Sequence, residues 1–313
     1  MSLGSRHVPV LLTLVAALLA VAAIPAGAFA GRNGDVVYGW SELEEPDVGP
    51  TWLYVEAIRA IAPGGGTPRT VTGCEQTLPL QAPQPARTCA AQVFADPSVS
   101  RDRARIAFDN GASIALVDPG GSDLQVLPAT SEDDSEPAFS AAGGRIAFSA
   151  GFHPTGSGGD GRSIWIRDLA GGAARLAIRG GVDPAWSVRN WIAYVSPDAE
   201  EIWMARPGGR RARRLASGSQ PAWSPHGTKL AYVRGSSIRV LELATRRSRV
   251  VARGVSPTDL AWSPDGRRLA YTLFDGGIET VRTDGTHVRK LVPGGVSATS
   301  SFGPVGVDWA PRR

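Results

Sequence analysis

One short pattern occurs six times along the chain, and this repetition limits the possible folds more than any other feature. Full copies begin at residues 97, 137, 184, 221 and 260, and a fragment, Val-Asp-Trp-Ala-Pro, begins at 307. Their anchor residues are spaced by 40, 47, 37, 39 and 47 positions. Repeats of this length are typical of the blades of a β-propeller. The anchors are Val99, Phe139, Trp186, Trp223, Trp262 and Trp309.

Each copy is predicted to form four short strands, because stretches of alternating apolar residues are separated by Gly, Pro and Asp. The strands are named a to d from the propeller axis outward. Strand a carries the anchor, and strand b contains Leu269-Ala270-Tyr271 or its counterpart. Strand d follows a glycine-rich turn, as tight hairpins demand positive φ. Strand c begins at an isoleucine in every copy: Ile58, Ile114, Ile164, Ile202, Ile238 and Ile278.

The two ends of the repeat array complete one another. The first strand b, residues 36–38, has no strand a before it, and the last strand a, residues 307–309, has no strand b after it. We expect the C-terminal strand to enter the first blade, because closing the ring removes exposed sheet edges. The sequence therefore predicts an all-β fold: a six-bladed β-propeller of four-stranded antiparallel blades, forming one domain over residues 31–313.

Residues 1–30 have the pattern of a signal peptide. Arg6 and His7 precede an apolar run over residues 8–24, and Ala28-Phe29-Ala30 matches a small-x-small cleavage site. Pro25 interrupts the run before the roughly 20 residues that a membrane span needs. We expect cleavage rather than retention as an anchor, no transmembrane segment afterwards, and a periplasmic or extracellular location. The globular composition, 42% hydrophobic and 20% charged, excludes collagen, coiled coil and wholesale disorder.

The chain has two cysteines, Cys74 and Cys89. In an oxidising compartment two cysteines this close most simply pair with each other. We predict a disulfide that stabilises its loop by roughly 3 kcal/mol on the entropic account. A zinc site is disfavoured because no nearby Cys or His completes four ligands.

The repeat resembles that of the TolB-like β-propellers, also called WD40-like repeat proteins. The string P-x-W-S-P-D-G-x-x-L-A-Y is carried most fully by residues 221–232 and 260–271. The resemblance implies the propeller fold and a partner-binding role, since TolB is a periplasmic subunit of the Tol-Pal system. TolB has an α/β domain ahead of its propeller, whereas the repeats here start near the expected cleavage site. Val99 and Phe139 also replace tryptophan, so membership of a Tol-Pal complex is not inferred.

We expect the recognition surface on one face of the propeller. The a–b and c–d turns share one face, and the b–c and d–a connections share the other. The longest segments all belong to the second class, and loops on a rigid scaffold usually carry binding residues. These segments are residues 39–57, 73–96, 128–136, 149–163 and 293–306. The candidate contacts on them are Glu44, Glu45, Trp52, Tyr54, Glu132, Asp133, Asp134, His153 and Asp160.

Simpler interpretations of these residues stay open. Trp52 and Tyr54 fit packing beneath their own loop as well as ligand stacking. The acidic string 131–136 fits solvated charge better than calcium binding, because its spacing matches no EF-hand loop. Residues 156–163 are glycine-rich but lack the lysine of a P-loop. We expect no cofactor, with calcium as the alternative.

Charge is unevenly distributed along the chain. Residues 31–140 hold 16 acidic and 7 basic side chains, whereas residues 201–313 hold 8 acidic and 19 basic ones. Such a dipole can orient the protein against a protein partner or an anionic envelope polymer, although we favour a merely solvated surface as the explanation. Predicted export disfavours nucleic-acid binding despite the basic runs. We expect a monomer.

No catalytic set stands out. The G-x-S-x-G motif of acyl-transfer enzymes is absent, and His153, His226 and His287 have no defined partner. The sequence favours a non-enzymatic binding or scaffold module of the bacterial cell envelope. The alternative is a divalent-metal-dependent hydrolase or lyase with its site at the central channel. Its weak metal-ligand candidates lie near the start of strand a: Glu136, Asp183, Asp259 and Asp308.

Overall fold

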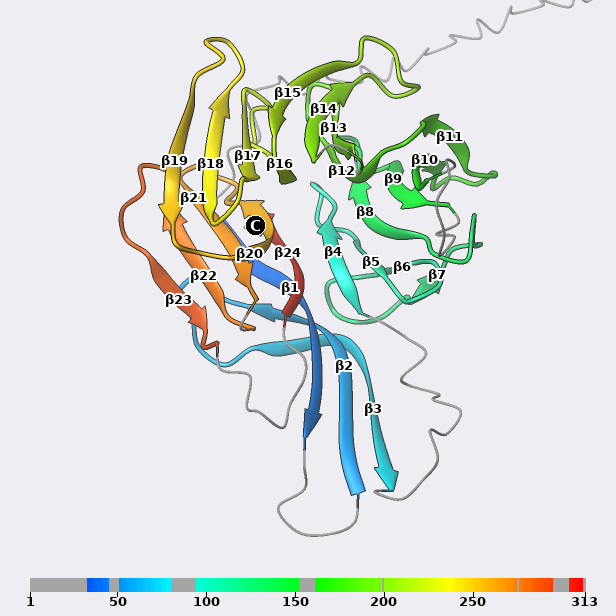
Figure 1. Ribbon diagram of the computed structural model, residues 1–313. Helices are drawn as coiled ribbons and strands as arrows, with labels where there is room; N and C mark the ends of the chain where they lie inside the picture. Colours follow the sequence, from blue (N-terminus) through cyan, green and yellow to red (C-terminus); the bar gives the residue numbers. More distant parts are fainter. Residues whose placement is uncertain are drawn as a thin grey trace, which may run out of the picture.

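The predicted architecture is confirmed by a computed structural model, which describes residues 33–44, 51–79, 94–151, 161–196, 198, 200–274, 276–294 and 304–311. Within these ranges the chain forms 24 strands and no helix. The strands make six separate four-stranded antiparallel sheets, which surround a common centre as the blades of a propeller (Figure 1).

The blades follow one another in chain order, each with its innermost strand first. Blade 1 is β24 (Pro304–Pro311), β1 (Asn33–Glu44), β2 (Thr51–Ile61) and β3 (Arg69–Pro79). Blade 2 is β4 (Ala95–Val99), β5 (Ile106–Asp109), β6 (Ile114–Val117) and β7 (Gln125–Val126). Blade 3 is β8 (Ser135–Phe139), β9 (Arg145–Ala150), β10 (Ser163–Asp168) and β11 (Arg175–Ile178).

The second half of the ring repeats this arrangement. Blade 4 is β12 (Val182–Trp186), β13 (Ile192–Ser196), β14 (Glu201–Ala205) and β15 (Arg213–Ser217). Blade 5 is β16 (Ser219–Trp223), β17 (Lys229–Val233), β18 (Ser237–Glu242) and β19 (Ser248–Arg253). Blade 6 is β20 (Pro257–Trp262), β21 (Arg268–Leu273), β22 (Ile278–Arg282) and β23 (Arg289–Val292).

The C-terminal strand closes the ring as predicted. β24 pairs antiparallel with β1, so that Val36 faces Trp309 and Tyr38 faces Val307; Figure 1 shows the two strands, red and blue, side by side. The indole Nε1 of Trp309 donates a hydrogen bond to the Gly34 carbonyl at 2.9 Å. The two ends of the described chain therefore stabilise one blade together.

Apolar side chains fill the spaces between neighbouring blades. The six isoleucines at the predicted strand c position are each at most 1% exposed. Tryptophans at the anchor position also join blades through hydrogen bonds: Trp223 Nε1 donates to the Ala185 carbonyl at 3.0 Å, and Trp262 Nε1 donates to the Ala222 carbonyl at 2.9 Å. These tryptophans therefore serve blade packing, as the sequence indicated.

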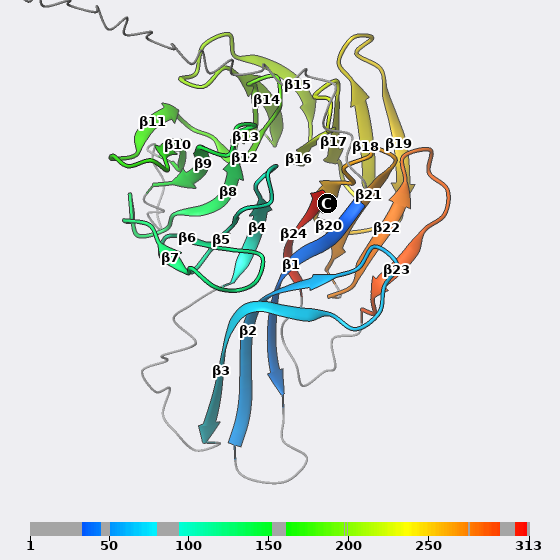
Figure 2. The same cartoon turned by 180° about the vertical axis from the view of Figure 1, so that it is seen from behind.

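The prediction that residues 39–57 and 73–96 are long loops is wrong over much of its length. Residues 39–44, 51–57 and 73–79 continue β1, β2 and β3 well beyond the other blades' strands. Glu44 pairs with Leu53, and Thr51 pairs with Pro79, so backbone hydrogen bonding maintains the sheet to its tip. Both views show this three-stranded extension projecting from the ring (Figures 1 and 2). It prolongs the b–c end of blade 1 and so lies on the side of the b–c connections.

Candidate binding mouth of the central channel

The innermost strands of all six blades enclose a cavity of about 460 Å³. It is lined by the four acids considered as weak metal ligands, Glu136, Asp183, Asp259 and Asp308, so the structure brings these four residues to one place. Asp96 of β4 and Gln220 of β16 line the same cavity, and sequence reasoning did not select them.

A backbone irregularity positions most of these polar side chains. β4, β8, β12 and β16 each contain a register shift against their neighbour. The residue within it adopts a positive φ: 46° at Asp96, 54° at Glu136, 55° at Asp183 and 52° at Gln220. A bulge of this kind re-aims a side chain and takes its residue out of the ladder. Because of these bulges, four inner strands turn one polar side chain each toward the cavity instead of keeping that residue in the regular sheet.

The carboxylates join adjacent blades through backbone hydrogen bonds. Glu136 Oε2 accepts from the Asp183 N–H, Asp259 Oδ2 accepts from the Val307 N–H, and Asp308 Oδ2 accepts from the Val99 N–H, each at 2.7 Å. In all three pairs the N–H belongs to the inner strand of the next blade. Hydrogen bonds to a charged acceptor are stronger than neutral ones. These three acids therefore help to hold neighbouring blades of the ring together.

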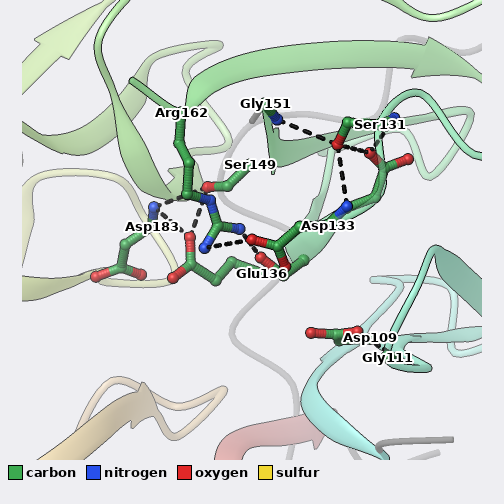
Figure 3. Close-up of polar contacts among 11 residues, drawn as sticks. Asp109, Gly111, Ser131, Asp133, Glu136, Ser149, Gly151, Arg162 and Asp183 are labelled. Carbon is green, nitrogen blue, oxygen red and sulfur yellow. Dashed lines mark hydrogen bonds and ion pairs between the residues drawn. The ribbon is translucent and has the colours of Figure 1, made fainter. Parts of the chain in front are cut away.

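Arg162, just before β10, brings the one positive charge that Figure 3 draws beside these acids. Its side chain is 17% exposed, Nη1 lies 3.6 Å from Asp133 Oδ2, and Nη2 donates to Ser135 Oγ. Two buried polar atoms here have no hydrogen-bond partner among the described residues: Arg162 Nε and Asp183 Oδ2. Arg162 therefore lies beside more carboxyl groups than the one, that of Asp133, with which it forms an ion pair.

Burial is the main cause of raised carboxyl pKa values around the cavity. Burial, with repulsion from neighbouring carboxylates, holds the pKa values of Asp96 and Asp183 well above their ordinary range. Burial raises the pKa of Asp259 to about 7 and those of Asp109 and Asp308 to about 6. The positive charge of Arg162 opposes this effect at Asp96 and Asp109.

The carboxylates of the cavity are distributed around the ring. Among the residues that the structure describes, no three His, Cys, Asp or Glu side chains are grouped so that they could hold a metal. Glu136, Asp259 and Asp308 each accept an N–H group from the next blade.

The predicted contact residues in the acidic connection before β8 differ in their exposure. Glu132 is exposed and Asp133 is partly exposed, facing Arg162. Asp134 is only 2% exposed, and its oxygens accept the N–H groups of Thr130 at 2.7 Å and Ser131 at 2.9 Å. Asp134 therefore holds its own loop together.

The remaining candidates lie on or beyond the blade 1 extension. Glu44, Trp52 and Tyr54 belong to the prolonged strands β1 and β2. Cys74 is in β3 and packs against the core between blades 1 and 2. Its pairing with Cys89 stays a prediction, because Cys89 lies outside the described residues. Outside them too lie the predicted signal peptide, residues 1–30, and three candidate contacts: Glu45, His153 and Asp160.

Two of the missed residues carry a signal in the sequence, and the other two do not. Asp96 precedes Pro97 as Glu136 precedes Pro137 and Asp183 precedes Pro184, and Gln220 precedes Pro221, so a polar residue before proline marks the bulge position. Arg162 belongs to a connection whose path no repeat defines. Phe274 is the fourth omission: it lies in the b–c turn after β21 and is 84% exposed.

The raised pKa values predict a protein that loses stability as pH rises. An unfolded aspartate titrates near 3.9, so between about pH 4 and the folded-state values the folded chain binds more protons than the unfolded chain. Stability is then greatest near pH 4 to 5 and falls as pH rises through 6 and 7, the pKa values of Asp308 and Asp259. Calorimetry at pH 5, 6, 7 and 8 should show a decreasing Tm.

Two variants assign this pH dependence. Asp259→Asn should flatten the decrease in Tm, because its side chain no longer titrates. Asp284→Asn is the matched control, since Asp284 is exposed and hydrogen bonds from Thr286 lower its pKa. Equal pH slopes for wild type and both variants would exclude Asp259 as a source of the effect.

Solved structures confirm the fold. No family model matches the sequence, and no curated protein matches it. TolB from Acinetobacter baumannii superposes with a TM-score of 0.66 at 19% identity, over 91% of this chain and 68% of that chain. A chain of the nidogen/laminin complex gives 0.61 at 13% identity, over 88% and 98%. The putative TolB from Agrobacterium tumefaciens gives 0.61 at 13% identity, over 86% and 91%.

Within the described ranges, no helix is long and apolar enough to span a bilayer. At the identities found, the structural matches establish the fold alone. The chain is a six-bladed, TolB-like β-propeller closed by its C-terminal strand.

Proposed function

We propose that the protein is an exported, non-enzymatic binding or scaffold propeller of the cell envelope. It recognises a protein or polymer partner on the face formed by the b–c and d–a connections. The exposure of Phe274 is the observation that carries this proposal. Phe274 is 84% exposed, and a partner that covers its aromatic side chain removes this apolar surface from water, as at interface hot spots.

The turn presents Phe274 in a fixed position. The Phe274 N–H donates to the Ser256 carbonyl at 3.2 Å, which ties this b–c turn to the d–a connection before β20. The Gly276 N–H donates to the Leu273 carbonyl at 2.9 Å, and Gly276 adopts a φ of 80°. The backbone is therefore held while the ring faces solvent, and a preorganised aromatic residue loses little entropy on binding.

Two further features belong to the same face. The three-stranded extension of blade 1 adds backbone surface beyond the ring. The mouth of the cavity adds the polar carboxyl groups of Asp96, Glu136 and Asp183. Together with Phe274 they suit a partner that presents an apolar pocket and a basic group.

The use of the carboxylates supports binding over catalysis. Glu136, Asp259 and Asp308 accept backbone N–H groups from the next blade, a structural task that explains their place in the ring. TolB-like and nidogen/laminin propellers share the fold, and the second was solved in a protein complex.

Capture experiments on matched variants test the proposal. Immobilised wild type, Phe274→Ser and Val288→Ser are exposed to envelope extract of the source cells, and bound proteins and polymers are quantified by mass spectrometry and sugar analysis. Val288 is 56% exposed and precedes β23 in the c–d turn of the same blade, on the opposite face. We expect Phe274→Ser to reduce capture of at least one component by roughly tenfold or more, as at interface hot spots.

Each result has a defined meaning once melting curves show that both variants fold like wild type. Val288→Ser should capture the same components as wild type. Equal capture by all three proteins, or equal loss in both variants, would contradict recognition through the b–c and d–a face.

A further inference from the structure

A small groove lies between blades 4 and 5, apart from the central cavity. It has a volume of about 220 Å³ and is lined by Arg213 and Leu215 of β15, Leu241 of β18, and Leu243 and Arg246 of the following turn. Leu241 is 5% exposed and belongs to the core between these blades, whereas Leu215 and Leu243 are partly exposed beside it. The interblade core thus reaches the surface between two arginines.

The surroundings of this groove are strongly basic. Residues 201–253 contain 12 basic and only 2 acidic side chains, Glu201 and Glu242. Glu201 Oε1 is already 2.5 Å from Arg214 Nε, and Glu242 Oε2 accepts a hydrogen bond from Thr245 at 3.2 Å. Several exposed arginines here form no ion pair within the described part of the chain, among them Arg210, Arg211, Arg246, Arg247 and Arg249.

Contacts within blade 4 hold one of the lining arginines in place. The Arg213 guanidinium lies 5.9 Å from the centre of the Trp191 ring, and its Nε donates to Met204 Sδ at 3.5 Å. Neither contact neutralises the charge. Arg246 occupies a tight turn with a φ of 56° and has no such contact. The groove therefore combines an apolar floor with two unneutralised guanidinium groups.

We propose that this groove binds an acidic peptide segment of a partner protein, in which one large apolar residue is flanked by Asp or Glu. The apolar side chain covers Leu215 and Leu243, and the flanking carboxylates pair with Arg213 and Arg246, since guanidinium and carboxylate form strong charge-assisted hydrogen bonds. The groove opens at the c–d turn, on the face opposite to Phe274. The protein can then hold two partners at once.

The composition of the turns distinguishes a peptide from other anions. Residues 206–212 and 244–247 contain only Arg, Pro, Gly, Ala and Thr, so nothing large and apolar projects from these turns. A lipid surface requires apolar side chains that enter it, whereas the leucines here are recessed. A purely anionic polymer satisfies the arginines but leaves the leucine floor uncovered. An acidic peptide with an apolar residue satisfies both.

The test uses the folded chain of residues 31–313 and defined probes. Fluorescence anisotropy measures binding of a labelled peptide Gly-Glu-Asp-Leu-Glu-Asp-Gly, and of the same peptide with serine in place of leucine. Vesicles containing phosphatidylglycerol are tested by sedimentation. We expect the leucine peptide to bind at least about fivefold more tightly than the serine peptide, because it alone covers the apolar floor.

Protein variants locate the site. Arg246→Glu should weaken the leucine peptide about tenfold, and Leu243→Ser should remove its advantage over the serine peptide. Arg234→Glu is the control, because Arg234 is equally exposed but lies in the b–c turn of the same blade, on the opposite face. Phe274→Ser should leave peptide binding unchanged, so this proposal and the proposed function fail separately.

Three outcomes would overturn the inference: equal affinity for both peptides, equal weakening by Arg246→Glu and Arg234→Glu, or vesicle binding without peptide binding. The first two would show unspecific charge attraction, and the third a lipid surface. Failure of either peptide to bind at millimolar concentration would also overturn it. Melting curves confirm that each variant folds.

Discussion

A chain that ends at residue 303 should not unfold cooperatively. Truncation removes β24, and with it the inner strand of blade 1 and the pairing of Val36 with Trp309. Val307 and Trp309 are only 3% and 4% exposed. Losing a buried tryptophan alone costs about 3–5 kcal/mol, against a total stability of about 5–15 kcal/mol for a typical protein.

Differential scanning calorimetry should show no sharp transition for the truncated chain. A synthetic peptide of residues 304–313 should restore the transition when added in excess, because it supplies the missing strand. The same peptide with Trp309→Ala should restore it poorly. A truncated chain that melts within a few degrees of the full one would show that closure contributes little to stability.

Gly306→Ala should be strongly destabilising although it removes no side chain. Gly306 has a φ of 75°, and a Cβ built there would lie 2.4 Å from the Asp96 Cα and 2.6 Å from the Asp96 nitrogen. Those atoms belong to β4, so relief requires β24 and β4 to move apart. We expect a loss of about 3 kcal/mol, combining the strain of a positive φ with overpacking, and a Tm lower by about 10 °C.

Gly254→Ala separates the two causes. Gly254 has a similar φ of 67°, but a Cβ there meets no atom within 4 Å. It should therefore lose only the conformational part, about 1 kcal/mol. Equal destabilisation of the two variants would show that the approach of β24 to β4 is loose.

The sequence predicted the propeller because each blade repeats the same requirements. An isoleucine at the start of strand c recurs in all six blades, and a tryptophan on strand a recurs in four of them. The offset between the first strand b and the last strand a indicated closure before any pairing was known. The long strands of blade 1 could not be predicted in this way, because residues 39–44 and 51–57 extend beyond the repeat and follow none of its spacing.

The residues of the candidate site were harder to predict from the sequence than the fold. The acid-proline pair marks the bulge in blades 2, 3 and 4, so Asp96 could have been found beside Glu136 and Asp183. Arg162 could not have been found in this way, because it lies in a connecting segment whose path the repeat does not define. Asp134 shows the opposite limit: the sequence presents a free acid, whereas the turn of residues 130–134 occupies both of its oxygens.

Ring closure also orders the events of biosynthesis. β24 leaves the ribosome after the other described strands, and its partner β1 is the first of them. Contacts between residues so distant in the chain form slowly and late. Blade 1 therefore stays incomplete until β24 has been made, and the nascent polypeptide keeps an unfinished sheet until then. A premature stop anywhere upstream of β24 leaves this same blade open, so truncations of different lengths share one structural defect.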